Sequence, residues 1–232
     1  MFFGGIVKGS VGIGMSMFSV PLITFILPPT KAMMLLCLPI IVTNLIQMDI
    51  KRGISNYRFF PMFIALFLGI LIGGKLILNL DLETISIIIA LTIIIFTFLN
   101  FLGLNLIGLK PKYEKKISVI IGFFSGVLGG LSTFYAPPII TFLVSLNLAK
   151  ENFIKTTATM YLLASIPLYS SLIYHGLGNF YDLLVSLIVT PLALLGQYFG
   201  TKIRVRLSNE IFKKSILIIL IIIGFSLLIK NL

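Results

Sequence analysis

The stretch GSVGIGMSMFSVP, residues 9–21, interrupts a long apolar run with glycines and a proline. The stretch GVLGGLSTFYAPP, residues 126–138, does the same in the second half of the chain. Glycine loosens a helix by its backbone freedom, and proline lacks the N–H group that a helix interior needs. The apolar runs 2–28 and 117–147, which contain these stretches, are therefore expected to be broken or re-entrant.

The two stretches are also the strongest part of an internal repeat. Ordered matches of glycine and proline are rarer by chance than matches of leucine, so they indicate a duplication. The repeat has a first copy over residues 1–109, a linker over 110–116 expected to be cytoplasmic, and a second copy over 117–232. A shift of 117 residues matches Gly9 with Gly126, Gly12 with Gly129 and Pro21 with Pro138. A shift of 127 residues matches Gly69 with Gly196 and Gly73 with Gly200.

The composition predicts a membrane protein. Hydrophobic residues make up 58% of the 232 positions and charged residues 11%, against about 25% charged in a soluble domain. The chain holds eight apolar stretches, most of them close to the roughly 20 residues that cross a bilayer. We therefore expect an all-α polytopic membrane protein with two inverted repeats of four apolar segments each. The stretches are 2–28, 32–50, 58–78, 84–109, 117–147, 153–174, 181–200 and 211–230.

The basic residues predict that the two copies have opposite orientations. Three of them lie in the loop at 49–58, whereas its equivalent in the second copy, 174–182, has none. In the next loop the first copy has one basic residue, Lys75, whereas the second copy has five, within 201–214. Cytoplasmic loops retain Lys and Arg, so equivalent loops with opposite bias lie on opposite sides. The net charge of +11 is thus a topology signal, and binding of nucleic acid is not expected.

The number of full crossings stays open between six and eight. If the first segment of each copy enters and returns on one side, 14 of the 18 basic residues share the cytoplasmic side. Eight plain crossings would divide the basic loops almost evenly between the two sides. An additional or missing crossing elsewhere in the chain would also satisfy the charges. The loops on the basic side would then be 49–58, 110–116, 148–155 and 201–214.

Paired broken segments in inverted copies are typical of the binding site of a secondary transporter. Each break would leave the N-terminus of a short helix within the membrane, where unpaired N–H groups favour an anion. The alternative is that small residues simply let helices pack closely. The substrate-binding candidates at the breaks are Gly12, Gly14, Ser16, Ser19, Gly129, Gly130, Ser132, Thr133 and Tyr135.

Polar residues of other apolar segments are weaker candidates. Asn44, Gln47 and Thr159 could line the pathway or form hydrogen bonds inside the bundle. Lys8 precedes Gly12 by four residues and could attract an anion, although snorkelling from a helix end to the interface is the favoured interpretation. The alternative overall function, a non-transporting anchor or assembly subunit, would need larger loops than the roughly 15 residues that the segment lengths leave.

Catalysis is not expected. The carboxylates fall at segment ends or in loops, and neither a zinc-protease HExxH motif nor a Walker A motif occurs in the sequence. The lone Cys37 rules out a disulfide framework and a CxxC site. No metal, cofactor or oligomeric state follows from these residues.

The glycine and proline pattern resembles the TauE/SafE sulfite exporter family, which includes 4-toluene sulfonate uptake permease type membrane transporters. The resemblance covers both halves, and Met15 and Leu131 depart from it where a further glycine is usual. It implies a carrier in the bacterial-type inner membrane for a small sulfur-containing anion such as sulfite or an organosulfonate. The motifs that carry it are Gly9-x-x-Gly12-x-Gly14 with Val20-Pro21, Gly126-x-x-Gly129-Gly130 with Pro137-Pro138, Gly69-x-x-x-Gly73 and Gly196-x-x-x-Gly200.

Overall fold

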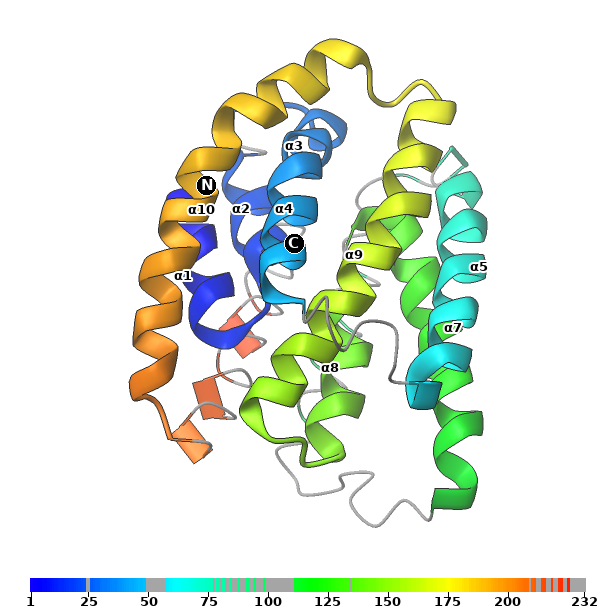
Figure 1. Ribbon diagram of the computed structural model, residues 1–232. Helices are drawn as coiled ribbons and strands as arrows, with labels where there is room; N and C mark the ends of the chain where they lie inside the picture. Colours follow the sequence, from blue (N-terminus) through cyan, green and yellow to red (C-terminus); the bar gives the residue numbers. More distant parts are fainter. Residues whose placement is uncertain are drawn as a thin grey trace.

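The computed structural model describes residues 1–23, 26–48, 57–76, 111–133 and 135–208, with single positions between 78 and 98 and between 210 and 225. In this part of the chain all regular secondary structure is helical (Figure 1). The predicted apolar segments 84–109 and 211–230 lie largely outside the described residues, and so does most of the basic loop at 49–58.

The first apolar run is broken at the predicted glycines. Helix α1 (Phe2–Val11) ends at Gly12, whose N–H donates to the carbonyl oxygen of Lys8 at 2.7 Å. Gly12 and Gly14 have φ angles of 82° and 93°, a region that glycine adopts without the clash of a side chain. Helix α2 (Met15–Ile23) then leads back toward the end of the molecule at which α1 begins (Figure 1).

The second run is broken within the predicted stretch 126–138, after its glycines. Helix α7 (Pro111–Ser132) includes Gly129 and Gly130 and ends before Thr133, and Tyr135 precedes α8 (Ala136–Ser145). The two glycines stay helical, and the absence of a Cβ atom at each allows neighbouring groups to pack closely against α7. A Cβ on Gly130 would collide with the carbonyl oxygen of Ile70, and one on Gly129 would lie 2.6 Å from the Cβ of Tyr135. Thr133, with a φ of 65°, makes the turn instead.

Longer helices complete the fold. In the described part of the chain, Thr30–Gln47 and Phe180–Arg206 are long and apolar enough to cross a membrane by length and composition. Large apolar side chains on the outer face of the second stretch are exposed, as lipid contact requires; Ile188 is 74% exposed. The remaining elements are α3 (Pro29–Leu35), α4 (Cys37–Gln47), η2 (Tyr57–Phe59), α5 (Phe60–Leu76), α9 (Lys150–Tyr174) and α10 (Phe180–Arg206).

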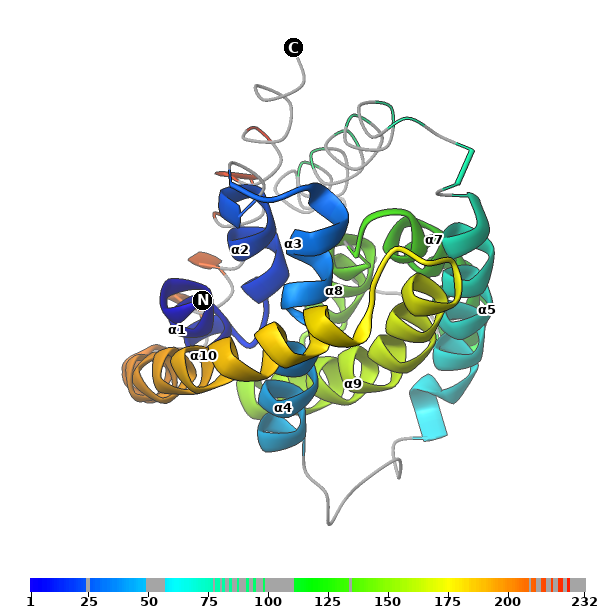
Figure 2. The ribbon, with the colours of Figure 1, turned by 90° about the horizontal axis from the view of Figure 1, so that it is seen from above.

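The described helices form two bundles. The first bundle consists of α1, α2, α3, α4 and α10, and the second of η2, α5, α7, α8 and α9. Figures 1 and 2 show the first bundle on the left and the second on the right. The main contact between the bundles is that of α4 with α9. Each bundle combines helices from both halves of the chain, because α10 joins the first and α5 the second.

Glycines permit the closest helix contacts in both bundles. A Cβ on Gly9 of α1 would lie 2.9 Å from the Cα of Gly200, so the backbones of α1 and α10 are in close contact there. A Cβ on Gly126 of α7 would also lie 2.9 Å from the Cα of Gly69, so the backbones of α7 and α5 are in close contact there. The two contacts occupy equivalent positions in the two copies if α7 corresponds to α1 and α10 to α5. Gly126 then follows Gly9 by 117 residues, and Gly200 follows Gly69 by 131. The second value differs from the shift of 127 in the sequence by about one helical turn.

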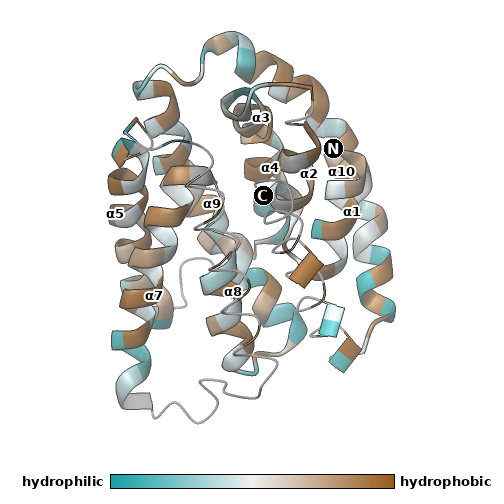
Figure 3. Ribbon diagram, turned by 180° about the vertical axis from the view of Figure 1, so that it is seen from behind, coloured by the Kyte–Doolittle hydropathy of each residue, from teal (hydrophilic) through white to brown (hydrophobic). Residues whose placement is uncertain are grey.

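The equivalent helix pairs run in opposite directions. In Figure 1, α1 and α10 descend, whereas α5 and α7 rise. This opposition is what an inverted repeat requires. The lower end in Figure 1, where α7 and α9 begin and α10 ends, is called the basic end here because Lys115, Lys116, Lys150, Arg204 and Arg206 lie there. Figure 3 shows the hydrophilic residues that begin α7 at this end.

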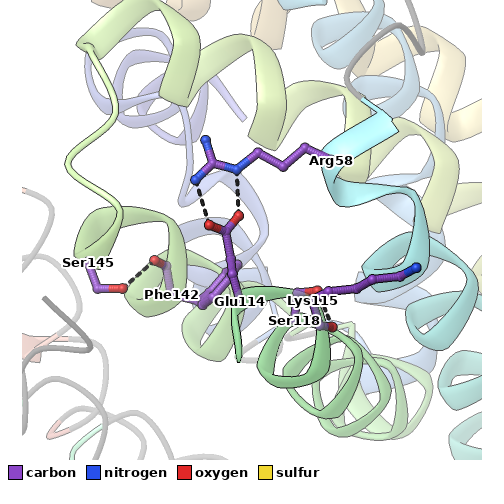
Figure 4. A network of polar contacts seen from close by, with 6 residues as sticks. All are labelled: Arg58, Glu114, Lys115, Ser118, Phe142 and Ser145. Carbon is purple, nitrogen blue, oxygen red and sulfur yellow. Dashed lines mark hydrogen bonds and ion pairs between the residues drawn. The ribbon is translucent and has the colours of Figure 1, made fainter. Parts of the chain in front are cut away.

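Ion pairs tie helices together within each bundle. Arg58 of η2 donates from Nε and Nη2 to both carboxylate oxygens of Glu114 on α7, at 2.5 and 2.8 Å (Figure 4). The carboxylate of Glu114 raises the pKa of the Arg58 guanidinium by this hydrogen bond. In the first bundle, Lys31 of α3 donates to Asp182 of α10 at 2.7 Å. The Lys31–Asp182 pair joins the two halves of the chain, whereas the Arg58–Glu114 pair joins the first half to the linker.

Candidate functional site

A small cavity lies where the two bundles meet. The space inside it that is open to a water-sized sphere is about 20 Å³, enough for about one water molecule. A larger solute would need the cavity to widen. The lining residues are Lys8, Gly14, Met15, Ser16, Ile40 and Asn44 from the first bundle, and Tyr135, Ala136 and Tyr161 from the second.

Both breaks lead into this cavity. Gly14 and Ser16 are at the start of α2, and Tyr135 and Ala136 are at the start of α8. The first intrahelical bond of α2 is donated by Phe18 to the carbonyl oxygen of Gly14, so the preceding N–H groups have no acceptor in their own helix. Such N-terminal ends carry partial positive charge. The sequence predicted this meeting of two helix starts, with Gly14, Ser16 and Tyr135 among its candidates.

Lys8 supplies the basic side chain of the cavity. Its side chain is 2% exposed, and its Nζ donates to Oδ1 of Asn44 on α4 at 2.6 Å. The Nζ atom also lies 5.8 Å from the centre of the Tyr161 ring. Among the described residues, no carboxylate forms a salt bridge with Lys8. The expectation that Lys8 snorkels to the interface is wrong, because α10 and α4 cover the helix that bears it.

Two further hydrogen-bond donors at the cavity lack a protein partner. The Nδ2 amide of Asn44 and the hydroxyl of Tyr161 are buried without a hydrogen bond in the described part of the chain. Buried polar groups are almost always paired, so an unpaired one at a cavity points to a ligand or water that it binds. Asn44 was a sequence candidate, whereas Tyr161 was missed because a tyrosine in an apolar segment resembles bundle packing.

Gln47 supports the cavity from outside it. Its Nε2 donates to the carbonyl oxygen of Lys8 at 3.2 Å, near the break that ends α1. Gln197 of α10 similarly donates to the carbonyl oxygen of Thr43 at 3.0 Å. These amide contacts hold α1, α4 and α10 together beside the cavity, which is the bundle-interior role stated as an alternative for Gln47.

Several sequence candidates lie away from the cavity. Ser19 packs against Gly4, and the Oγ1 of Thr159 donates to the carbonyl oxygen of Lys155 in its own helix at 2.8 Å. Gly12 packs against Ile154 of α9. The structure therefore gives these residues packing roles. The other candidates outside the cavity are Gly129 and Gly130 within α7, and Thr133, which is buried at the turn; the side chain of Ser132 lies outside the described residues.

The fold and the cavity define a class of protein. Helical structure throughout the described residues, apolar outer faces and a polar cavity between two bundles are typical of multi-pass membrane transport proteins. The family model described as Sulfite exporter TauE/SafE matches residues 1–227 of the chain. The chain therefore belongs to the TauE/SafE sulfite exporter family. Comparisons with curated proteins and with solved structures found no match.

Proposed function

We propose that the protein is a secondary carrier of a small sulfur-containing anion, such as sulfite or an organosulfonate, and that the anion binds in the cavity beside Lys8. The sulfur chemistry is proposed from the family, which is named for sulfite export. The site is proposed from the residues that line the cavity.

The burial of Lys8 is the observation that carries the proposal. An ammonium inside a membrane is costly unless an opposite charge accompanies it. The described part of the chain supplies Asn44 as an uncharged acceptor but no carboxylate beside it. A bound anion would compensate the charge, and the unpaired donors of Asn44 and Tyr161 would contact its oxygens.

The position of the cavity favours alternating access by relative motion of the bundles. Substrate sites between two repeat-built bodies become exposed to each side in turn when one body rocks against the other. Lys31–Asp182 lies within the first bundle and Arg58–Glu114 within the second, so these pairs would move with their own bundles. We propose that α4 and α9, which make the main contact between bundles, form the pivot.

Contacts at the basic end would close the cavity on that side. Lys150 at the start of α9 donates to the carbonyl oxygens of Arg204 and Leu207, at 3.1 and 2.9 Å. The guanidinium of Arg204 also lies 3.6 Å from the carboxylate of Glu151. These contacts join the second bundle to the end of α10 in the first. Opening toward the basic end would require them to break.

We further propose that residues 1–109 and 117–232 are inverted repeats and that the basic end faces the cytoplasm. The support is the opposite direction of the two glycine-packed helix pairs and the position of the basic residues. Positive residues are retained on the cytoplasmic side. We propose that the protein lies in a cell membrane and acts as a carrier without catalytic function.

Anion flux through the purified protein tests the proposal. Proteoliposomes loaded with buffer would be diluted into radiolabelled sulfite, and uptake would be compared with that of empty liposomes and of liposomes containing an unrelated membrane protein. Saturable uptake that unlabelled sulfite or a sulfonate competes away is the expected result. If neither sulfite nor any sulfonate moves faster than through empty liposomes, the proposed function is wrong.

A further inference from the structure

The outer face of α10 joins an apolar stripe to two cations. The helix lies at the outer edge of the molecule in Figures 1 and 2. Exposed apolar residues follow one another on one of its faces at intervals of four, three and four residues, the spacing of a single helix face; they are Ile188, Leu192, Leu195 and Phe199, called the outer stripe here. Lys202 and Arg206 continue this face toward the basic end at intervals of three and four residues, and both are exposed.

The two cations lack an acidic partner. Among the described residues, no carboxylate forms a salt bridge with Lys202 or Arg206. The nearby carboxylate of Glu151 lies beside Arg204 instead, at 3.6 Å. Like charges four residues apart on one helix face repel each other, and an anion between them would replace this repulsion with attraction. The pair therefore favours a negatively charged partner from outside the chain.

Tyr198 holds one of the cations beside the end of the outer stripe. The Nζ of Lys202 lies 4.4 Å from the centre of the Tyr198 ring, where the ring face attracts a cation. The rings of Tyr198 and Phe199 are 5.8 Å apart, and both side chains are exposed. Exposed aromatic residues of this kind are typical of the boundary between acyl chains and lipid head groups. Along α10, the order is therefore apolar stripe, aromatic pair and cations.

The opposite end of α10 has aromatic residues without unpaired cations. Phe180 and Tyr181 are exposed there, and the loop at 174–182 contains no basic residue. Lys31, which approaches this end from α3, already donates to Asp182 at 2.7 Å. On this helix, the combination of exposed apolar surface and uncompensated positive charge thus belongs to the basic end.

We propose that the outer stripe binds an anionic phospholipid of the bilayer leaflet at the basic end. The lipid phosphate lies between Lys202 and Arg206, and an acyl chain lies along Phe199, Leu195 and Leu192. A phosphodiester lipid carries both the negative charge that the cations attract and the apolar chain that the stripe would contact. A free phosphate would use the cations alone. This lipid site is separate from the cavity between the bundles and goes beyond the proposed function.

Thermal unfolding of the purified full-length protein in lipid–detergent mixed micelles tests the site. The probes are phosphatidylglycerol and phosphatidylcholine with the same acyl chains, each titrated at constant ionic strength. A ligand that binds the folded state raises the unfolding temperature with its concentration relative to its dissociation constant. Phosphatidylglycerol is expected to stabilise the protein more than phosphatidylcholine does, because only its head group carries a net negative charge.

Two double variants separate a defined site from general surface charge. Lys202→Gln with Arg206→Gln removes both cations and is expected to weaken phosphatidylglycerol binding at least about tenfold. Lys115→Gln with Lys116→Gln removes two exposed charges of α7 at the same end, and it should bind this lipid like the parent protein. All four side chains are exposed, so both double variants should unfold near the parent temperature in phosphatidylcholine.

The outcomes decide between a lipid and other partners. Equal stabilisation by phosphatidylglycerol and phosphatidylcholine would overturn the selection of an anionic lipid. Equal losses in the two double variants would overturn the site, because diffuse surface charge would then attract the lipid. Glycerol 3-phosphate, a head group without acyl chains, should affect the parent and the Lys202→Gln, Arg206→Gln variant alike. If it stabilises the parent alone, the cations bind free phosphate compounds and the assignment to a lipid is wrong.

Discussion

The ammonium of Lys8 and the side-chain oxygen of Asn44 form a buried hydrogen bond of 2.6 Å between α1 and α4. Asn44 thus orients the cation without neutralising it. We predict that Asn44→Asp pairs with Lys8 as an ion pair and so competes with the anion, lowering anion affinity at least about tenfold, an effect of about 1.4 kcal/mol.

Thermal stability distinguishes this effect from misfolding. A complete buried ion pair should leave the unfolding temperature of Asn44→Asp near that of the parent protein, because neither partner is left unpaired. Anion titrations by thermal shift would then show the lost affinity. An Asn44→Asp protein that folds and binds the anion as well as the parent does would contradict the role of an uncompensated Lys8.

Removal of the cation itself should also abolish strong binding. Lys8→Gln keeps a hydrogen-bond donor of similar length but has no charge. A hydrogen bond to a charged group contributes about 1.5–3 kcal/mol, so affinity is expected to fall about 10- to 100-fold. Sulfite uptake into proteoliposomes would measure the effect. The control is Lys75→Gln at the exposed end of α5, which should behave like the parent.

Sequence patterns predicted much of this site because its breaks depend on local chemistry. Glycines at 12 and 14 and the prolines after Tyr135 signal where helices end and begin, so the meeting of two helix starts follows from the repeat. The basic loops likewise predict opposite directions for the two halves, which stays a proposal. These signals need no knowledge of which distant helices touch.

The rest of the site depends on contacts between distant segments. Lys8 looks like an interfacial residue until α10, nearly 190 positions away, is seen to cover it. Tyr161 has no local signal that separates it from a packing tyrosine. Gly129 and Gly130 look like a turn, but they remain helical because α5 and Tyr135 occupy the space of their missing side chains.

Close packing of α5 on α7 makes Gly126 intolerant of a side chain. In Gly126→Ala the new Cβ would collide with the carbonyl oxygen of Leu66, which belongs to the helix backbone and cannot rotate away. Overpacking of this kind costs about 1–3 kcal/mol, which should lower the unfolding temperature. In Gly178→Ala the new Cβ meets the flexible end of the Met34 side chain, so a smaller loss is expected. Equal losses would contradict the packing argument.

The proposed inverted arrangement predicts which residues share a membrane face. In a Cys37→Ala background, Lys115→Cys at the start of α7 and Arg206→Cys at the end of α10 should react with a membrane-impermeant maleimide from the cytoplasmic side. Tyr174→Cys, at an 86% exposed position where α9 ends, should react from the opposite side. Right-side-out and inside-out vesicles give the two measurements. Labelling of Lys115→Cys and Arg206→Cys from different sides would rule out the inversion.

The contacts of Lys150 at the end of α10 should control access to the cavity from the basic end. Ser16 lines the cavity, so Ser16→Cys in the Cys37→Ala background reports access to a small thiol reagent. Lys150→Met removes the two hydrogen bonds that join α9 to α10. We predict that it increases the labelling rate of Ser16→Cys in inside-out vesicles about tenfold, which corresponds to about 1.4 kcal/mol in the opening equilibrium.

Two controls make the access experiment specific. Lys116→Met removes an exposed lysine of the basic end that belongs to α7, and it should leave the labelling rate unchanged. Ser19→Cys lies on the same helix as Ser16→Cys but packs against Gly4 and is 2% exposed, so it should label slowly in every background. Because a bound anion would occupy the cavity, saturating methanesulfonate should slow the labelling of Ser16→Cys. If Lys116→Met accelerates labelling as much as Lys150→Met does, the effect comes from surface charge and not from closure between the bundles.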